Sequence, residues 1–184
     1  ESLIDSISDC DLVLATCGRI HYQKECKLDS LENITSWIKN FKGFKNLAII
    51  FGREDRGLTN RELLLAHKVF TVNTHKNFPS LNLSHAVSIV LYEFSKIAKT
   101  NNILKKKDLD FATSKQIEDS FLEIENLLLK TGYVLPHTLD AKVSKFKNYI
   151  HRSETSKHEL DVIRGIVHQI NWALDNRNKN NSIK

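Results

Sequence analysis

Three short apolar runs in the first half of the chain predict β-strands: Asp11–Thr16, Leu47–Phe51 and Val69–Asn73. They are rich in β-branched and aromatic residues, and they are continuous rather than alternating. This pattern is typical of strands buried on both faces, as in a parallel sheet.

Apolar residues at helical spacing predict helices between and after these strands. One helix is expected over Asp29–Phe41, a second from Thr59 or Asn60 to His67, and a third over Ser84–Lys99. The predicted buried positions are Leu31, Ile34 and Ile38 in the first helix, and Ala86, Ile89, Val90, Phe94 and Ile97 in the third. Alternation of strands and helices predicts an α/β fold with right-handed crossovers.

The second half of the chain predicts only helices. Gly132 and Pro136 are expected to end the first of these helices. The three helices have these predicted buried positions: Ile117, Phe121, Ile124 and Leu128 in the first; Val143, Phe146 and Ile150 in the second; and Leu160, Ile163, Val167, Ile170 and Leu174 in the third. We expect an α/β domain over residues 1–100, a polar linker over 101–113, a helical extension over 114–176 and a frayed tail over 177–184.

Composition narrows the class of protein only a little. The net charge of +5 and the pI of about 9.1 permit a polyanionic partner without requiring one. Three cysteines without CxxC spacing and scattered histidines argue against a disulfide framework or a metal site and favour the reducing cytoplasm. No apolar run approaches the roughly 20 residues of a membrane span. The chain holds no methionine and starts at Glu1, from which we expect that it is part of a longer protein.

In an open parallel sheet, ligands bind beyond the carboxyl ends of the strands, so three loops are candidates for a site. The first follows Thr16, the second runs from Gly52 to Leu58, and the third precedes Ser84. The second loop, GREDRG, lacks the Lys-Ser/Thr of a phosphate-binding P-loop. One interpretation of this loop is a tight turn with a surface ion pair. The other is a backbone that faces a ligand: Glu54 and Arg53 or Arg56 would brace the loop, and Gly52 would let the ligand approach closely.

The third candidate loop holds Pro79, Ser80, Asn82 and Ser84. Ser84 is predicted to cap the helix that follows it. Capping does not account for Asn82 between two leucines, and a ligand could satisfy that amide.

The stretch LAIIFGREDRGLTNRELLLAHKVFTVNTHKNFPSLNLSHAVSIVLYEF resembles two signature motifs of the SpoU, or TrmH-like, RNA ribose methyltransferases of the SPOUT class. DLVLATCGR resembles the strand and loop before them. LLLKTGYVLP and ELDVIRGIVHQI resemble the helical tail of the TrmJ-like tRNA methyltransferase subgroup.

This resemblance implies a trefoil-knotted α/β fold with a helical extension, and S-adenosylmethionine held by the knot loops. The residues implied to bind the cofactor are Thr16, Cys17, Gly18, Gly52, Val72, Ser80, Leu81 and Asn82. Ser80 and Asn82 are also the implied catalytic residues, which would orient the ribose or the methionine end of the cofactor. The family's first motif, with its catalytic arginine, is expected upstream of Glu1.

A predicted helix of the tail places Lys142, Lys145, Tyr149 and Arg152 on one face, at i, i+3, i+7 and i+10. The face is either solvated surface or, as the resemblance implies, an RNA-binding surface in which cations contact phosphates. Val143, Phe146 and Ile150 are expected to pack inward.

The expected function is S-adenosylmethionine-dependent 2′-O-ribose methylation of tRNA, in the anticodon loop if the subgroup resemblance holds. We expect a homodimer, because the Ser84–Lys99 helix is apolar around much of its circumference. The alternatives are an RNA-binding module or an inactive methyltransferase homologue, and a generic nucleotide-binding α/β protein.

Overall fold

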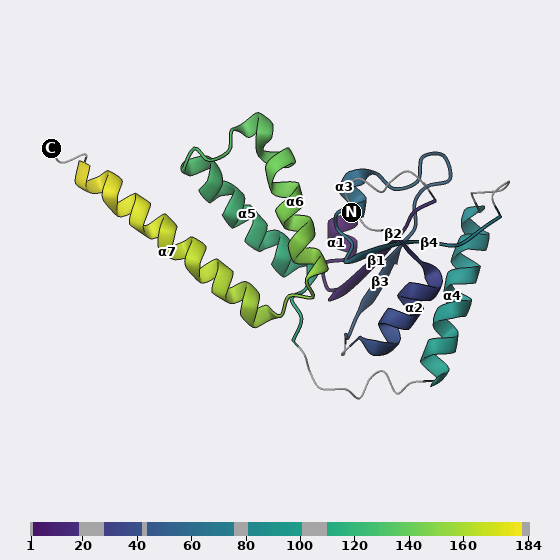
Figure 1. Cartoon of the computed structure of the whole chain (residues 1–184). Coiled ribbons are helices and arrows are strands. Elements are labelled where there is room, and N and C mark those ends of the chain that lie inside the picture. Colours follow the sequence, from purple (N-terminus) through teal and green to yellow (C-terminus); the bar gives the residue numbers. More distant parts are fainter. Residues whose placement is uncertain (1, 19–27, 42–43, 76–80, 101–109, 182–184) are drawn as a thin grey trace.

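The computed structural model describes residues 2–18, 28–41, 44–75, 81–100 and 110–181. A parallel sheet with flanking helices lies beside a group of three long helices (Figure 1). The α/β fold with a helical extension that the sequence predicts is confirmed.

Four parallel strands form the sheet, in the order β2-β4-β1-β3. They are β1 (Leu12–Thr16), β2 (Leu28–Ser30), β3 (Leu47–Ile50) and β4 (Lys68–Thr71). The sequence predicted β1, β3 and β4 but not β2, whose residues were assigned to a loop and to the start of a helix. Because β2 is a three-residue, half-buried edge strand, it carries no apolar run; Asp29 pairs there with Lys68 of β4 at 3.7 Å.

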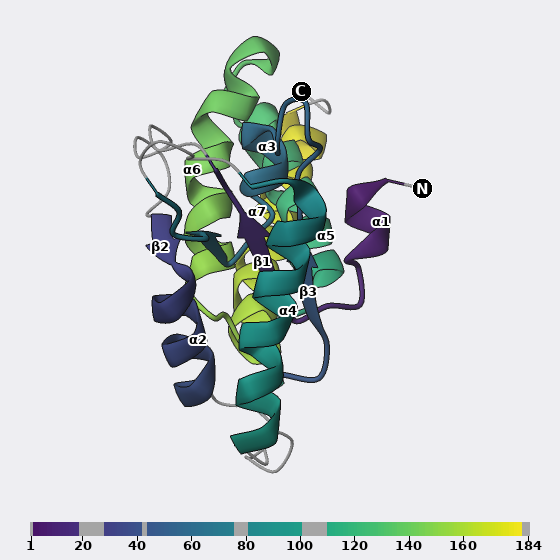
Figure 2. The same cartoon turned by 90° about the vertical axis from the view of Figure 1, so that its right-hand side faces the viewer.

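Alternate residues of β1 supply two cores, one on each face of the sheet. Leu12 and Leu14 pack with α2 (Leu31–Asn40) and α4 (Leu83–Thr100), while Val13 and Ala15 pack on the side of α1 (Leu3–Ser6) and α3 (Asn60–Leu63). Figures 1 and 2 show α2 and α4 together on one face. Complete burial of β1 on both faces explains its continuous apolar sequence.

The helical extension consists of α5 (Ser114–Lys130), a short η2 (Pro136–Thr138), α6 (Leu139–Arg152) and α7 (Lys157–Asn181). Gly132 ends the α5 region with a φ of 72°, as its position predicted. The helix α7 continues to Asn181, beyond residue 176 where we expected the extension to end, because no glycine or proline interrupts its polar end.

Three predicted core positions are wrong. Ile89 of α4, Phe146 of α6 and Ile170 of α7 are 39%, 43% and 42% exposed. Each lies at the edge of its apolar stripe, where the spacing fits a buried face but no neighbouring element covers the side chain. Phe146 still meets Phe121 edge-on, with ring centroids 5.4 Å apart.

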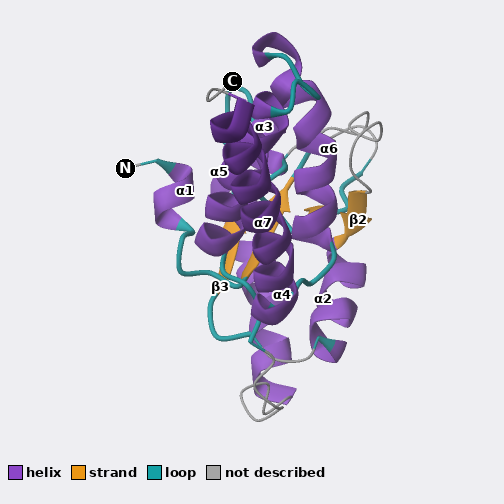
Figure 3. Ribbon diagram, turned by 90° about the vertical axis from the view of Figure 1, so that its left-hand side faces the viewer, coloured by secondary structure: helices purple, strands orange, loops and turns teal. Residues whose placement is uncertain are grey.

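The extension packs against the α1 and α3 side of the sheet through backbone and buried polar contacts (Figure 3). The carbonyl of Cys10 accepts from both the backbone N–H and the hydroxyl of Ser114, at 2.9 and 3.2 Å. His67, in the turn before β4, accepts a hydrogen bond at Nδ1 from the Val13 N–H at 3.1 Å and meets the ring of His151 of α6 edge-on at 5.8 Å.

Stability should fall on mild acidification because of His67. Burial, with the neighbouring His151, lowers the pKa of His67 to about 3, whereas an unfolded histidine titrates near 6.5. Between these values the unfolded chain binds the extra proton, so stability is lost as the pH falls from about 6.5 towards 3. From pH 6.5 to 5 the loss from this group is about 2 kcal/mol.

Urea unfolding at several pH values measures this effect. His67→Gln keeps an acceptor for the Val13 N–H but cannot titrate, so its stability should depend less on pH in this window. His158→Gln, at an exposed position, is the control and should keep the slope of the unaltered protein. Equal slopes for His67→Gln and the unaltered protein would contradict the assignment.

Candidate functional site

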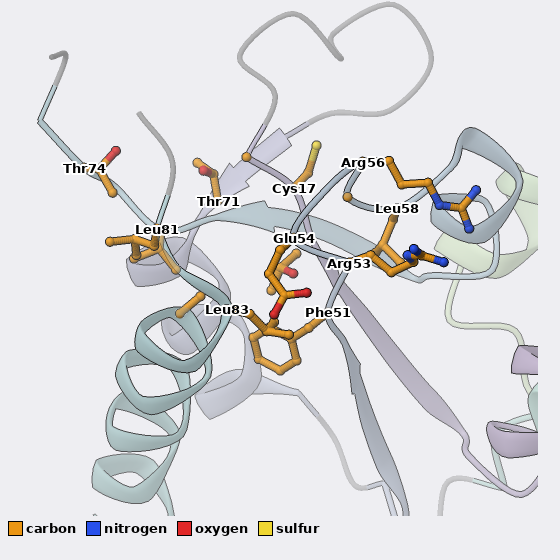
Figure 4. A pocket seen from close by; sticks show the side chains of 16 residues that line it. Cys17, Phe51, Arg53, Glu54, Arg56, Leu58, Thr71, Thr74, Leu81 and Leu83 are labelled. Atoms are coloured by element: carbon orange, nitrogen blue, oxygen red, sulfur yellow. The ribbon is translucent and has the colours of Figure 1, made fainter. Parts of the chain in front are cut away.

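A pocket of about 280 Å³ lies at the carboxyl ends of β1, β3 and β4, where the first residues of α4 close one side (Figure 4). The lining comes from four segments: Thr16, Cys17 and Gly18; Phe51, Gly52, Arg53, Glu54, Arg56, Gly57 and Leu58; Thr71, Val72 and Thr74; and Leu81, Leu83 and Ala86.

Six of the eight residues predicted to bind the cofactor line this one pocket: Thr16, Cys17, Gly18, Gly52, Val72 and Leu81. They come from positions up to 65 residues apart in sequence. Asn82 lies next to the lining, and Ser80 lies outside the described residues. The binding roles of these residues stay predictions, but their convergence is what a single ligand would require.

Hydrogen bonds between the strand ends fix the first loop. The Thr16 hydroxyl donates to the Ile50 carbonyl of β3 at 3.2 Å, and the Cys17 N–H donates to the Phe70 carbonyl of β4 at 2.8 Å. The chain leaving β1 is therefore bonded to both neighbouring strands as it enters the pocket.

Two of the three residues predicted to brace the charged loop, Arg53 and Arg56, make ion pairs, but with carboxylates other than Glu54. Arg53 makes a two-pronged ion pair with Asp55, with both N–O distances 3.0 Å, and Arg56 lies 4.0 Å from Glu62. Glu54 was predicted as a brace, but within the described part of the chain it makes no ion pair and lies at the pocket (Figure 4). The i, i+2 spacing of Arg53 and Asp55 across a tight turn favours that pair instead.

Glu62 also holds the end of this loop through a capping box. Its carboxylate accepts from the Thr59 N–H at 2.6 Å, while the Thr59 hydroxyl accepts from the Glu62 N–H at 3.3 Å. These bonds to Thr59 lower the pKa of Glu62, with Arg56 contributing a smaller part. The cap at Thr59 was predicted from sequence; the helix α3 is shorter than expected, ending at Leu63 rather than His67.

Gly52 is required by the loop itself. A Cβ at this position would lie 2.5 Å from the backbone of both Gly57 and Leu58. Gly57 turns the chain back with a φ of 68°, and its N–H donates to the Arg53 carbonyl at 2.8 Å. The predicted approach of a ligand to Gly52 is therefore not needed to explain the glycine.

Asn82, rather than Ser84, caps α4. Its Oδ1 accepts from both the backbone N–H and the hydroxyl of Ser84, at 2.9 and 2.7 Å, and the helix begins at Leu83. Although Asn82 stands between two leucines, its side chain is exposed. The Asn82 side-chain oxygen is used in capping α4, and its two N–H donors take no part in the cap.

Residues that sequence reasoning missed are mostly apolar walls and strand ends: Phe51, Leu58, Leu83, Thr71, Thr74 and Ala86. Their sequence signal was position: Phe51, Leu58, Thr71 and Thr74 lie at or near the ends of predicted strands and loops, and Leu83 and Ala86 at the start of α4. Among the residues that the structure describes, no cluster of His, Cys, Asp and Glu could hold a metal ion, and no helix is long and apolar enough to cross a membrane.

On α6, the four residues of the predicted RNA-binding face, Lys142, Lys145, Tyr149 and Arg152, are all exposed. Val143 and Ile150 are buried beneath them as expected. The helix start lies beside α3, where Arg61 and Asp140 form an ion pair.

A parallel sheet with a pocket at its carboxyl edge, built from three strand-end loops and a helix start, defines a ligand-binding α/β protein. Residues 2–92 match the family described as SpoU rRNA Methylase. By this domain the chain belongs to the SpoU family of RNA methyltransferases, in the SPOUT class.

Similar proteins extend the match over nearly the whole chain. An uncharacterised tRNA/rRNA methyltransferase of Haemophilus influenzae is 27% identical, covering 95% of this chain and 72% of that protein. The tRNA (cytidine/uridine/adenosine-2′-O-)-methyltransferase TrmJ of Pseudomonas aeruginosa is also 27% identical, over 91% and 69%. The crystal structure of TrmJ from Z. mobilis ZM4 superposes with a TM-score of 0.75 at 26% identity, covering 92% of this chain and 71% of that one.

Adding one methyl group at Gly52 should disturb the fold. Because the new Cβ meets backbone that cannot rotate away, Gly52→Ala should lower the free energy of unfolding by about 1–3 kcal/mol, the usual cost of overpacking. Urea unfolding measures the change. Gly18→Ala is the matched control, since a Cβ there meets no atom within 4 Å; equal stability of the two variants would contradict the clash.

Proposed function

We propose that this protein transfers a methyl group from S-adenosylmethionine to the 2′-oxygen of a ribose in tRNA. The observation that carries the proposal is the convergence of six predicted cofactor residues on one pocket in a SpoU-family domain. The names of the relatives, which are tRNA 2′-O-methyltransferases, support the substrate. The trefoil knot that the family resemblance implies stays a prediction.

When bound, the cofactor supplies a methyl group on a positively charged sulfur, which is electrophilic without a metal. The protein's task is to align the ribose oxygen with that methyl and to exclude misaligned approaches. In the proposal the loops after β1 and β3 hold the cofactor, and Val72 with the start of α4 forms the opposite wall. The N–H donors of Asn82, which bond to no other described residue, are proposed to orient the cofactor or the ribose, since Ser84 engages only the oxygen.

The helical extension is proposed to bind the tRNA. Lys145 and Arg152 make no ion pair within the described part of the chain, so their charges are available to phosphates. The arginines at the pocket are neutralised instead: Arg53 by Asp55, Arg56 by Glu62 and, on the nearby α3, Arg61 by Asp140. Methylation in the anticodon loop is the position that the subgroup resemblance favours.

We also propose a homodimer that pairs through the outer face of α4. Ile89, Leu91 and Tyr92 are exposed there, at 39%, 55% and 64%. Between them lie Ser88 and Ser95, whose hydroxyls donate to carbonyls of their own helix, Ser84 and Tyr92, at 2.8 and 2.7 Å. Small side chains whose donors are already satisfied allow a second helix to approach closely without stranding a polar group.

The function is tested by cofactor binding and methyl transfer. Calorimetry should detect S-adenosylmethionine binding, and in protein that includes the motif expected upstream of Glu1 labelled methyl should appear on tRNA ribose. The leucine side chain of Gly18→Leu would enter open space at the pocket and occlude it. Cofactor affinity should fall at least about tenfold, which corresponds to 1.4 kcal/mol. The free energy of unfolding should not change. Binding of tRNA without binding of S-adenosylmethionine would contradict the proposal and favour the RNA-binding module.

The dimer is tested by light scattering at micromolar concentration. Leu91→Asp places a charge within the proposed interface and should give monomers, because an unpaired charge in a dry interface costs several kcal/mol. Leu122→Asp, at an equally exposed leucine of α5, should leave the dimer intact. A monomeric unaltered protein, or the same mass for both variants, would argue against α4 as the interface.

A further inference from the structure

The turn between α5 and α6 displays two large apolar side chains to solvent. Tyr133 is 67% and Leu135 is 55% exposed, while Val134 between them is 2% exposed and anchors the turn in the core of the extension. This segment belongs to LLLKTGYVLP, which the proposed function has not used. Tyrosine is enriched at binding interfaces, because its ring offers a large apolar face and its hydroxyl a polar group.

Hydrogen bonds hold the turn in one conformation. The Gly132 N–H donates to the Leu129 carbonyl at 3.0 Å, and the Val134 N–H donates to the Leu128 carbonyl at 3.3 Å. The Leu135 N–H donates to the Thr138 hydroxyl at 3.2 Å. The backbone of Tyr133 is therefore fixed on both sides, so little backbone entropy would be lost when its ring binds a partner.

A cation lies against the Tyr133 ring. The Lys142 ammonium is 5.2 Å from the ring centroid and donates to the Tyr133 carbonyl at 3.1 Å. This contact places a positive charge beside an exposed aromatic face. The pair combines the two groups that contact a base and its phosphate in proteins that bind single-stranded nucleic acid.

The same chemistry continues along α6, with Lys145, Tyr149 and Arg152 following Lys142. Ten helical residues span about 15 Å, which is about four stacked bases at 3.4 Å each. The tip of the α5–α6 hairpin and α3, which adjoins the pocket loops, lie at the same end of the molecule (Figures 1 and 2).

We propose that Tyr133 is a stacking platform for an unpaired RNA base, with Lys142 and the α6 cations binding the flanking phosphates. This inference rests on the proposed function and makes it more specific: the extension selects unpaired nucleotides rather than duplex. Unpaired RNA fits better than a protein partner, because the exposed rings alternate with ammonium and guanidinium groups that no carboxylate of the described residues neutralises.

Binding of an unpaired RNA oligonucleotide and of an RNA duplex to the whole protein tests the proposal. Tyr133→Ala should weaken binding of the oligonucleotide by about 5- to 100-fold, the range found when a stacking aromatic is removed, and leave the duplex unaffected. Tyr133→Phe keeps the ring and should bind both as the unaltered protein does. Trp172→Ala, at a similarly exposed ring of α7 over which no amine of the described residues lies, should also change neither affinity.

Salt dependence separates stacking from charge. Tyr133→Ala should keep the slope of log affinity against log salt, whereas Lys145→Ala with Arg152→Ala should reduce it by roughly 1.4, about 0.7 for each phosphate contact to a single strand. The control, Lys39→Ala with Lys45→Ala, removes the same charge from the sheet domain and should leave the slope unchanged. Unchanged oligonucleotide binding by Tyr133→Ala, or equal losses for oligonucleotide and duplex, would overturn the proposal. The proposed function is tested separately, by measuring cofactor binding and by measuring methyl transfer at saturating tRNA.

Discussion

The architecture depends on one strand, β1, being buried on both faces and bonded to β3 on one side and β4 on the other. Because all three strands are parallel, their carboxyl ends reach the same edge of the sheet. Three loops separated by dozens of residues in sequence thereby meet at one pocket. Thr16 and Cys17, the last residues of the strand and the first of its loop, carry the bonds that keep these loops in register.

Charge is distributed differently at the two ends of the proposed RNA path. At the pocket Arg53 and Arg56 each meet a carboxylate, so these two residues shape the loop rather than attract a polyanion. Such exposed pairs contribute little stability individually, but the geometry of Arg53 and Asp55 supports the tight turn. On α6, Lys142 lies beside the Tyr133 ring, and Lys142, Lys145 and Arg152 have no carboxylate partner among the described residues. The proposals therefore place cofactor binding and RNA binding on different surfaces of one chain.

Much of the fold could be predicted from the sequence because continuous apolar runs and helical spacing report burial directly. The strand β2 escaped prediction because a three-residue edge strand has no such run. Ile89 and Phe146 were wrongly expected in the core, because spacing cannot show where neighbouring elements stop. At the site, the motifs located the loops, but the sequence could not show that Gly52 is constrained by its own loop, or that Asn82 caps α4.

The carbonyl of Cys10 accepts two hydrogen bonds from Ser114, and the Lys115 N–H adds a third contact to the Ser8 carbonyl at 3.3 Å. The sheet domain therefore uses the first turn of α5 to complete the loop before β1. A truncation that removes the extension would leave the Cys10 carbonyl without these donors. For anyone building chimeras in this family, the exchangeable unit is not the extension alone: the graft must bring its own donor for this loop, or the recipient's loop must be exchanged with it.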